Sequence, residues 1–114
     1  MSGRNVERIA VFQREFLQDL RYWVKADRVA ENESLVRAVY SGLLKIADPD
    51  VHYATFKLND GRTFVHIASF PSKEKGAILT ESPAFKAFQK DLKDRCDELP
   101  DPQPLTEVGS FGFV

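Results

Sequence analysis

The spacing of apolar residues along the chain changes between a helical and a strand-like period. Apolar side chains at every third or fourth position predict a helix over residues 5–20, although this segment could instead run straight into a strand. Residues 20–25 alternate as a strand does. Helical spacing returns over residues 36–47 and stops at the Asp48-Pro49-Asp50 turn. This part of the chain is therefore predicted to form helix, strand and helix.

The clearest local signal is a β-hairpin. Residues 51–58 and 62–70 are rich in aromatic and β-branched side chains, and Asn59-Asp60-Gly61 joins them. An Asp-Gly pair suits the positive φ angles of a type I′ turn. If these two residues form the loop, the register pairs Ala54 with Ile67, Phe56 with Val65 and Leu58 with Thr63.

The second half of the chain predicts one more helix and one more strand. A loop is expected over residues 71–76, and Ser82 is a good N-cap for a helix that starts at Pro83 and runs to Leu99. Prolines at 100, 102 and 104 would end it, and residues 105–114 would supply the last strand.

The predicted order is βαββαβ, which is typical of an α+β, ferredoxin-like sandwich with both helices on one face of an antiparallel sheet. The first and third strands would be central. One such domain would span residues 18–114, after an N-terminal helical extension over residues 1–17. A chain of 114 residues has the usual length of a single domain.

The hairpin register also divides the sheet into two faces. One face is almost purely apolar and is predicted to receive the helices; it carries Ala54, Phe56, Leu58, Val65 and Ile67. The other face mixes aromatic with polar side chains, namely Val51, Tyr53, Thr55, Lys57, Phe64, His66, Ala68 and Phe70, and Trp23 would join it. Such a face is too apolar for water, so it is expected to pair with a second copy in a homodimer or to lie under the N-terminal helix.

Composition excludes several classes of protein. Sixteen basic and seventeen acidic residues give a net charge of −1, which argues against nucleic-acid binding. No apolar stretch approaches the roughly 20 residues of a membrane helix, and with one cysteine the chain is expected to be cytoplasmic. The two histidines form no recognisable metal site, and no nucleotide-binding motif is present, so neither metal nor cofactor is expected.

His66 is the first candidate for chemistry, because a histidine in a partly buried cavity can accept a proton at neutral pH. Trp23, Tyr53, Thr55 and Phe64 are candidates for binding a planar substrate. The alternative for His66 is a hydrogen-bonded histidine in a dimer interface, and for Trp23 and Tyr53 it is packing within that interface.

Several stretches resemble the antibiotic-biosynthesis-monooxygenase-like family: VAENE at 29–33, YATFKLNDGRTFVH at 53–66, FKAFQ at 85–89, Arg95-Cys96 and EVGS at 107–110. The resemblance covers about residues 20–113. It implies a ferredoxin-like protomer that pairs through its sheet into a dimeric α/β barrel, with a ligand cavity between sheet and helices. The family includes cofactor-free oxygenases of aromatic polyketides and haem-degrading enzymes. Haem degraders use a histidine on the second helix, and residues 82–99 contain none.

The sequence therefore predicts a cofactor-independent, monooxygenase-like protein that acts on a small aromatic or quinol-like substrate, with His66 assisting deprotonation. The alternative is a non-catalytic dimeric barrel that binds a ligand or serves in a stress response. A third interpretation is an interaction module that uses the N-terminal helix.

Overall fold

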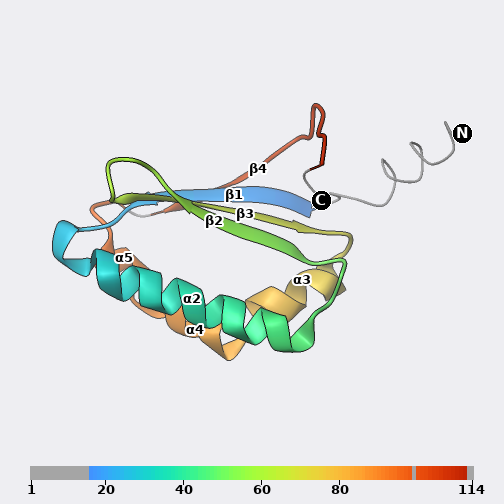
Figure 1. The fold of residues 1–114 in the computed structure, drawn as a ribbon, viewed down its shortest axis with the longest axis horizontal. Helices are drawn as coiled ribbons and strands as arrows, with labels where there is room; N and C mark the ends of the chain where they lie inside the picture. The colour runs from blue at the N-terminus through green and yellow to red at the C-terminus, as the bar shows by residue number, and fades with distance from the viewer. Residues whose placement is uncertain (1–15, 99, 113–114) are drawn as a thin grey trace, which may run out of the picture.

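The computed structural model describes residues 16–98 and 100–112. It contains a four-stranded antiparallel sheet in the order β2-β3-β1-β4, with the helices gathered on one face (Figure 1). This is the α+β, ferredoxin-like arrangement predicted, with β1 and β3 central. The elements are β1 (Phe16–Trp23), η1 (Ala26–Arg28), α2 (Val29–Ile46), β2 (His52–Lys57), β3 (Thr63–Phe70), α3 (Lys73–Thr80), α4 (Pro83–Lys90), α5 (Leu92–Arg95) and β4 (Asp101–Pro104).

The hairpin register is confirmed, although its turn type is not. Ala54 pairs with Ile67 and Phe56 with Val65. Gly61 has a φ of +74°, but Asp60 does not have the positive φ that a type I′ turn needs. Instead the Asp60 carboxylate closes the loop, because it accepts hydrogen bonds from the backbone N–H groups of Arg62 and Thr63, each at 2.9 Å.

Both ends of the sheet differ from the prediction. Strand β1 begins at Phe16, so residues 16–20 are strand and not the end of a helix; the rest of the predicted extension, residues 1–15, lies outside the described residues. The last strand is the proline-containing β4, and residues 105–112 are not strand. Proline is tolerated in β4 because this strand lies at the edge of the sheet.

The helices also differ in length and number from those predicted. Helix α2 begins at Val29, earlier than expected, and ends before Ala47, which adopts the left-handed conformation. Helix α3 occupies the predicted loop, with Ser72 as its N-cap. Ser82 caps α4 as predicted, but α4 ends at Lys90 and the chain continues through the short α5 to an extended Cys96.

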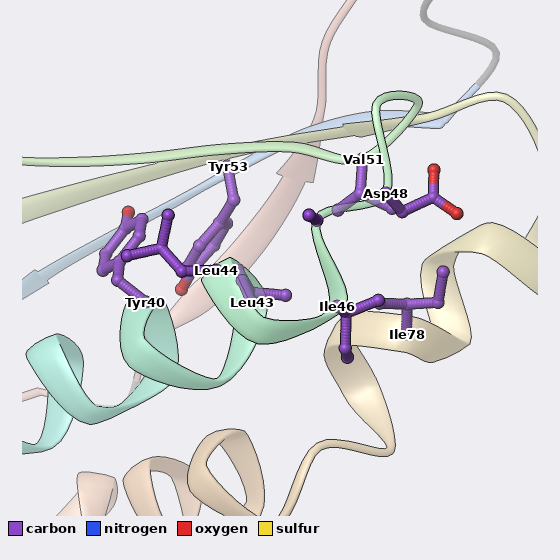
Figure 2. Close-up of a pocket in the computed structure, with 9 residues that line it drawn as sticks. Tyr40, Leu43, Leu44, Ile46, Asp48, Val51, Tyr53 and Ile78 are labelled. Carbon is purple, nitrogen blue, oxygen red and sulfur yellow. The ribbon is translucent and has the colours of Figure 1, made fainter.

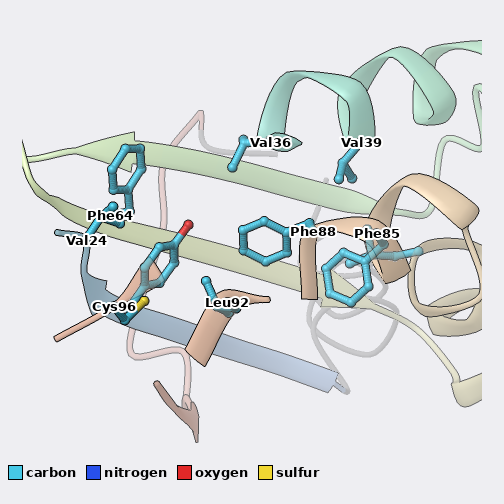
Figure 3. Close-up of a cluster of buried hydrophobic side chains, with 10 residues drawn as sticks. Val24, Val36, Val39, Phe64, Phe85, Phe88, Leu92 and Cys96 are labelled. Atoms are coloured by element: carbon cyan, nitrogen blue, oxygen red, sulfur yellow. The ribbon is translucent and has the colours of Figure 1, made fainter. Parts of the chain in front are cut away.

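The assignment of the two sheet faces was wrong. The helices cover the face of Tyr53, Thr55, Phe64 and His66, where Phe64 is 2% exposed, whereas Phe56 on the other face is 48% exposed. The hydrophobic core therefore lies between this mixed face and helices α2, α4 and α5 (Figure 3). Its buried members are Tyr22, Val24, Val36, Val39, Phe64, Leu79, Phe85, Phe88, Leu92 and Cys96.

No helix in the described ranges combines the length and the apolar character needed to cross a membrane.

Candidate functional site

His66 lies at the centre of the buried face, on β3. Its side chain is 3% exposed and lies between two tyrosine hydroxyls. The Oη atom of Tyr22 is 2.5 Å from Nε2 of the imidazole, and Oη of Tyr53 is 2.5 Å from Nδ1. Tyr22 is on β1 and Tyr53 on β2, the two neighbours of β3. The tyrosines reach the imidazole because each is diagonal to His66 on its neighbouring strand.

Helices α2 and α5, together with Thr55 of β2, extend these contacts into a longer chain of hydrogen bonds. On one side Nδ2 of Asn32 donates to Oη of Tyr22 at 3.0 Å, and Nε of Arg95 donates to Oδ1 of Asn32 at 3.1 Å. On the other side Oγ1 of Thr55 is 3.3 Å from Nδ1 of His66 and 2.7 Å from Oη of Tyr40. We call this the tyrosine–histidine chain; its members are Arg95, Asn32, Tyr22, His66, Tyr53, Thr55 and Tyr40.

Arg95 stands at the innermost end of the tyrosine–histidine chain. It is 1% exposed, and its Nη2 donates to the carbonyl of Phe88 at 2.6 Å while the guanidinium lies 5.4 Å from the centre of the Phe88 ring. It forms no ion pair with any described residue. Burial lowers the pKa of Arg95. A guanidinium nevertheless stays charged in proteins, so Arg95 places a positive charge at this end.

The other titratable members of the chain are neutral at pH 7. Burial lowers the pKa of His66 to about 4, because the imidazolium would lose its hydration. Burial likewise raises the pKa of Tyr22, Tyr53 and Tyr40 above the usual range of a phenol. The site therefore holds one neutral imidazole, three neutral phenols and one cation.

In the described part of the chain, at least three hollows border the tyrosine–histidine chain. A cavity of about 160 Å³ lies between the sheet and helices α3 and α4, where His66 and Tyr53 form part of its wall. We call it the histidine cavity; it is lined by Gln18, Asp19, Leu20, Tyr53, His66, Ala68, Phe70, Leu79, Thr80, Phe85, Gln89 and Pro102. A cavity of about 150 Å³ is large enough to hold benzene, so the histidine cavity has room for a ligand with one ring.

The other two hollows lie along helix α2. One, of about 230 Å³, is bordered by Tyr40 and Tyr53 and by apolar side chains at the end of α2 (Figure 2). The other, of about 360 Å³, is bordered by Thr55 and Phe64 and by a group of charged side chains, namely Glu33, Arg37 and Lys57. In this group the Glu33 carboxylate accepts a short hydrogen bond from Lys57, which lowers the pKa of Glu33.

The predicted site residues fall into two groups. The structure brings His66, Tyr53 and Thr55 together, and Phe64 stacks on Tyr22 with ring centres 5.6 Å apart. Trp23 was expected on the same face and is not there. It lies on the open face, 45% exposed, with the guanidinium of Arg62 4.3 Å from its ring centre.

The sequence-based prediction missed four members of the chain: Tyr22, Asn32, Tyr40 and Arg95. Asn32 carried a usable signal, because it precedes Val36 and Val39 by four and seven residues and so shares their buried side of α2. A polar side chain on a buried stripe needs a partner. Arg95 carried no such signal, because it lies in a run of mixed charge that is typical of an exposed helix.

The described part of the chain contains no group of three or more His, Cys, Asp or Glu side chains placed to hold one metal ion.

The sequence matches no protein-family model and no curated protein. Solved structures do match the fold. A protein from Nitrosomonas europaea, provisionally named an antibiotic biosynthesis monooxygenase, is 14% identical with a TM-score of 0.68, covering 89% of this chain and 95% of its own. A variant of SnoaB, a cofactor-independent oxygenase from Streptomyces nogalater, is 14% identical with a TM-score of 0.64, covering 89% and 98%. A conserved protein from Methanosarcina mazei Go1 is 13% identical with a TM-score of 0.66, covering 86% and 96%.

The Nitrosomonas europaea protein carries the family name that the sequence resemblance suggested. At identities this low, the likeness shows that the chain shares their fold. Activity and substrate have to be argued from the site itself.

Proposed function

We propose that this protein is a cofactor-independent, monooxygenase-like enzyme that acts on a small aromatic or quinol-like substrate in the histidine cavity. The observation that carries the proposal is the wall of this cavity, where His66 and Tyr53 are hydrogen-bonded to each other among apolar side chains. The volume of about 160 Å³ favours a substrate with a single ring. The fold shared with a cofactor-independent oxygenase supports the same reaction class.

The reaction needs molecular oxygen as the second substrate. Loss of a proton to water from an electron-rich CH₂ group of the substrate, which a quinol has in its keto tautomer, gives a carbanion. The carbanion donates an electron pair to oxygen and, when a proton returns, forms a hydroperoxide. Elimination of water then leaves a carbonyl group. One oxygen atom enters the substrate, and the other leaves as water together with the two hydrogens of the CH₂ group. The protein has to hold the substrate and favour its ionised form.

His66 would assist this ionisation through Tyr53 and not by direct contact alone. Both ring nitrogens already face tyrosine hydroxyls, so the imidazole acts on the substrate through the hydroxyl of Tyr53. In an apolar cavity, a hydrogen bond from this hydroxyl would stabilise a substrate anion more than it would in water. Thr55 would hold the neighbouring hydroxyl groups in place, and Phe64 would pack behind Tyr22.

Oxygen uptake in the presence of single-ring quinols and related activated aromatic compounds tests this function. His66→Asn and Tyr53→Phe should each lower kcat/KM by roughly a hundredfold, the lower range for loss of general acid–base assistance. His52→Asn is the matched control, because His52 is on the opposite face of β2 and should retain full activity. Unchanged turnover in His66→Asn would show that this role is wrong.

The alternative is a non-catalytic ligand-binding protein, such as one with a role in a stress response, and one observation favours it. His66 is 3% exposed with both ring nitrogens occupied, as expected of a histidine that only stabilises the fold. A thermal-shift screen distinguishes the two functions. Compounds that stabilise the wild-type protein, but cause no oxygen uptake in it, would support the ligand-binding function.

A homodimer formed through the sheet is also part of the proposal. Tyr53 and Phe64 were expected from the sequence at this interface, but both pack into the core beneath the helices. The open face has its own exposed apolar residues instead, Trp23, Phe56 and Leu58. A second copy seated on this face would bury them and complete a dimeric α/β barrel. A cytoplasmic location fits the single thiol of Cys96, which is buried and free.

A further inference from the structure

The hydrogen bond between Arg95 and Asn32 determines the orientation of the side-chain amide of Asn32. Arginine has N–H donors and no acceptor. The atom of Asn32 that lies 3.1 Å from Nε of Arg95 must therefore be the oxygen. The amide nitrogen of Asn32 then points to Tyr22, to whose Oη it donates at 3.0 Å.

The orientation of this amide in turn determines where the proton of Tyr22 points. Because Oη of Tyr22 accepts from Asn32, its own proton needs an acceptor, and Nε2 of His66 lies 2.5 Å away. If Nε2 carried a proton instead, Oη would accept two hydrogen bonds and its own proton would have no partner among the described residues. A buried donor without a partner costs about 1–3 kcal/mol. Tyr22 therefore donates to Nε2.

The proton of the imidazole follows from the same reasoning. His66 is neutral at pH 7, so it carries one proton, and with Nε2 acting as an acceptor this proton is on Nδ1. Nδ1 then donates to Oη of Tyr53 at 2.5 Å. The proton of Tyr53 is left to point away from His66, towards Thr55 or towards a ligand in the histidine cavity.

We propose that Arg95 is a positioning residue: through Asn32 and Tyr22 it keeps the proton of His66 on Nδ1 and makes the hydroxyl of Tyr53 a hydrogen-bond donor to an oxyanion in the histidine cavity. From Arg95 as far as Tyr53, every donor points away from the buried guanidinium. Hydrogen bonds aligned in one direction polarise one another, so the chain favours negative charge at its outer end. The role of the oxyanion rests on the proposed function, whereas the position of the proton does not.

The position of the proton is measured by long-range ¹H–¹⁵N NMR of the ligand-free, ¹⁵N-labelled full chain, which distinguishes the protonated from the unprotonated ring nitrogen. The wild type should show the proton of His66 on Nδ1. His52→Asn assigns the signals, because it leaves His66 as the remaining histidine of the chain. A proton on Nε2 in the wild-type protein would overturn the inference, whatever the oxygen-uptake assay shows.

Asn32→Asp should reverse the direction of the hydrogen bonds between residue 32 and His66, while the side chain keeps nearly the same shape. A carboxylate accepts from Arg95 and also from the hydroxyl of Tyr22, so Oη of Tyr22 must now accept from His66. The proton of His66 should move to Nε2. Arg95→Lys, which keeps a donor, should retain it on Nδ1. Asn59→Asp is the matched control, because it makes the same substitution at an exposed residue of the hairpin loop. An unchanged proton position in Asn32→Asp contradicts the proposal.

The role of Tyr53 as a donor is tested with 4-nitrophenol, a single-ring probe whose absorbance reports its ionisation. The wild-type protein should bind the phenolate in preference to the phenol. This preference should fall about tenfold in Tyr53→Phe, which has no donor. In Asn32→Asp it should fall similarly, because Tyr53 must then donate to Nδ1. An equal preference in all three proteins would refute the donor role, while the NMR result still decides the position of the proton. The effect of both variants on oxygen uptake tests the proposed function separately.

Discussion

The imidazole of His66 couples the stability of the fold to pH. Burial lowers its pKa to about 4 in the folded protein, against about 6.5 in the unfolded chain. Between these two values the unfolded chain binds more protons than the folded one. Stability is therefore complete above about pH 6.5 and falls as the pH is lowered towards 4. At 1.36 kcal/mol for each pKa unit, the total loss is about 3 kcal/mol.

Urea unfolding at pH 7 and pH 5 measures this effect. The wild type should lose about 2 kcal/mol between the two pH values because of His66. His66→Gln should lose much less over the same interval, although it starts from a lower stability at pH 7. His52→Gln keeps the buried imidazole and should behave as the wild type does. Equal pH dependence in wild type and His66→Gln would mean that His66 is readily protonated in the folded protein.

The hydroxyl of Tyr22 should contribute more to stability than that of Tyr40. Tyr22→Phe leaves both Nδ2 of Asn32 and Nε2 of His66 without their hydrogen-bond partner in the core, which should lower the free energy of unfolding by about 1–3 kcal/mol. Tyr40 is half-buried, and its hydroxyl bonds to Thr55. Tyr40→Phe is the matched variant and should cost about 1 kcal/mol or less. Denaturant unfolding at pH 7 compares the two, and an equal cost would contradict the importance assigned to the Asn32–Tyr22–His66 contacts.

At the scale of helices and strands, local chemistry explains which elements could be predicted. The hairpin register follows from a turn that is closed by local hydrogen bonds, since the Asp60 carboxylate accepts from the backbone N–H groups of Arg62 and Thr63. The cap of α4 is equally local, since Ser82 accepts from the N–H of Phe85. The edge strand β4 could not be predicted in the same way, because its prolines are allowed by its place in the sheet and not by its own sequence.

The faces of the sheet could not be assigned from the sequence because both carry apolar side chains. The prediction gave the helices the purely apolar face, whereas the core took the face that includes His66 and Thr55. Polar side chains can enter a core when partners from other elements satisfy them. Those partners are Tyr22 from β1, Asn32 and Tyr40 from α2, and Arg95 from α5. These partners are far from His66 in the sequence. The two-residue period of the strands therefore placed His66 and Tyr53 on one face, but it could not identify the rest of the site.

The N-cap of α4 offers a test at the same scale. Ser82→Ala removes the oxygen that accepts from the N–H of Phe85 and should lower the free energy of unfolding by about 1 kcal/mol. Helix α4 carries Phe85 into the wall of the histidine cavity, so this variant should also weaken binding there. Ser41→Ala, at an exposed position of α2, is the control and should change stability by less than half as much. Unfolding monitored by circular dichroism compares the two variants; equal stability would show that the cap contributes nothing.

At the scale of the whole molecule, the open face of the sheet is the surface on which the proposed dimer depends. Among the residues that the structure describes, helices cover one face and none covers the other (Figure 1). On the open face, Trp23 and Phe56 are each close to half exposed, and Leu58 is partly exposed beside them. Apolar side chains grouped in this way typically mark an interface. Because the cavities lie on the opposite face, pairing through this surface would leave the histidine cavity open to ligands.

We expect a dimer in solution at micromolar concentration, and Phe56→Glu should convert it to a monomer. Two symmetry-related carboxylates at the centre of an apolar interface would repel each other and lose their hydration. Leu44→Glu is the matched control, because Leu44 is an exposed leucine, 78% accessible, on the helical side of the molecule. Sedimentation or light scattering should give a doubled mass for the wild type and for Leu44→Glu, and a single mass for Phe56→Glu. A wild-type monomer at these concentrations would refute pairing through the sheet, and the exposed aromatic face would then need a different partner.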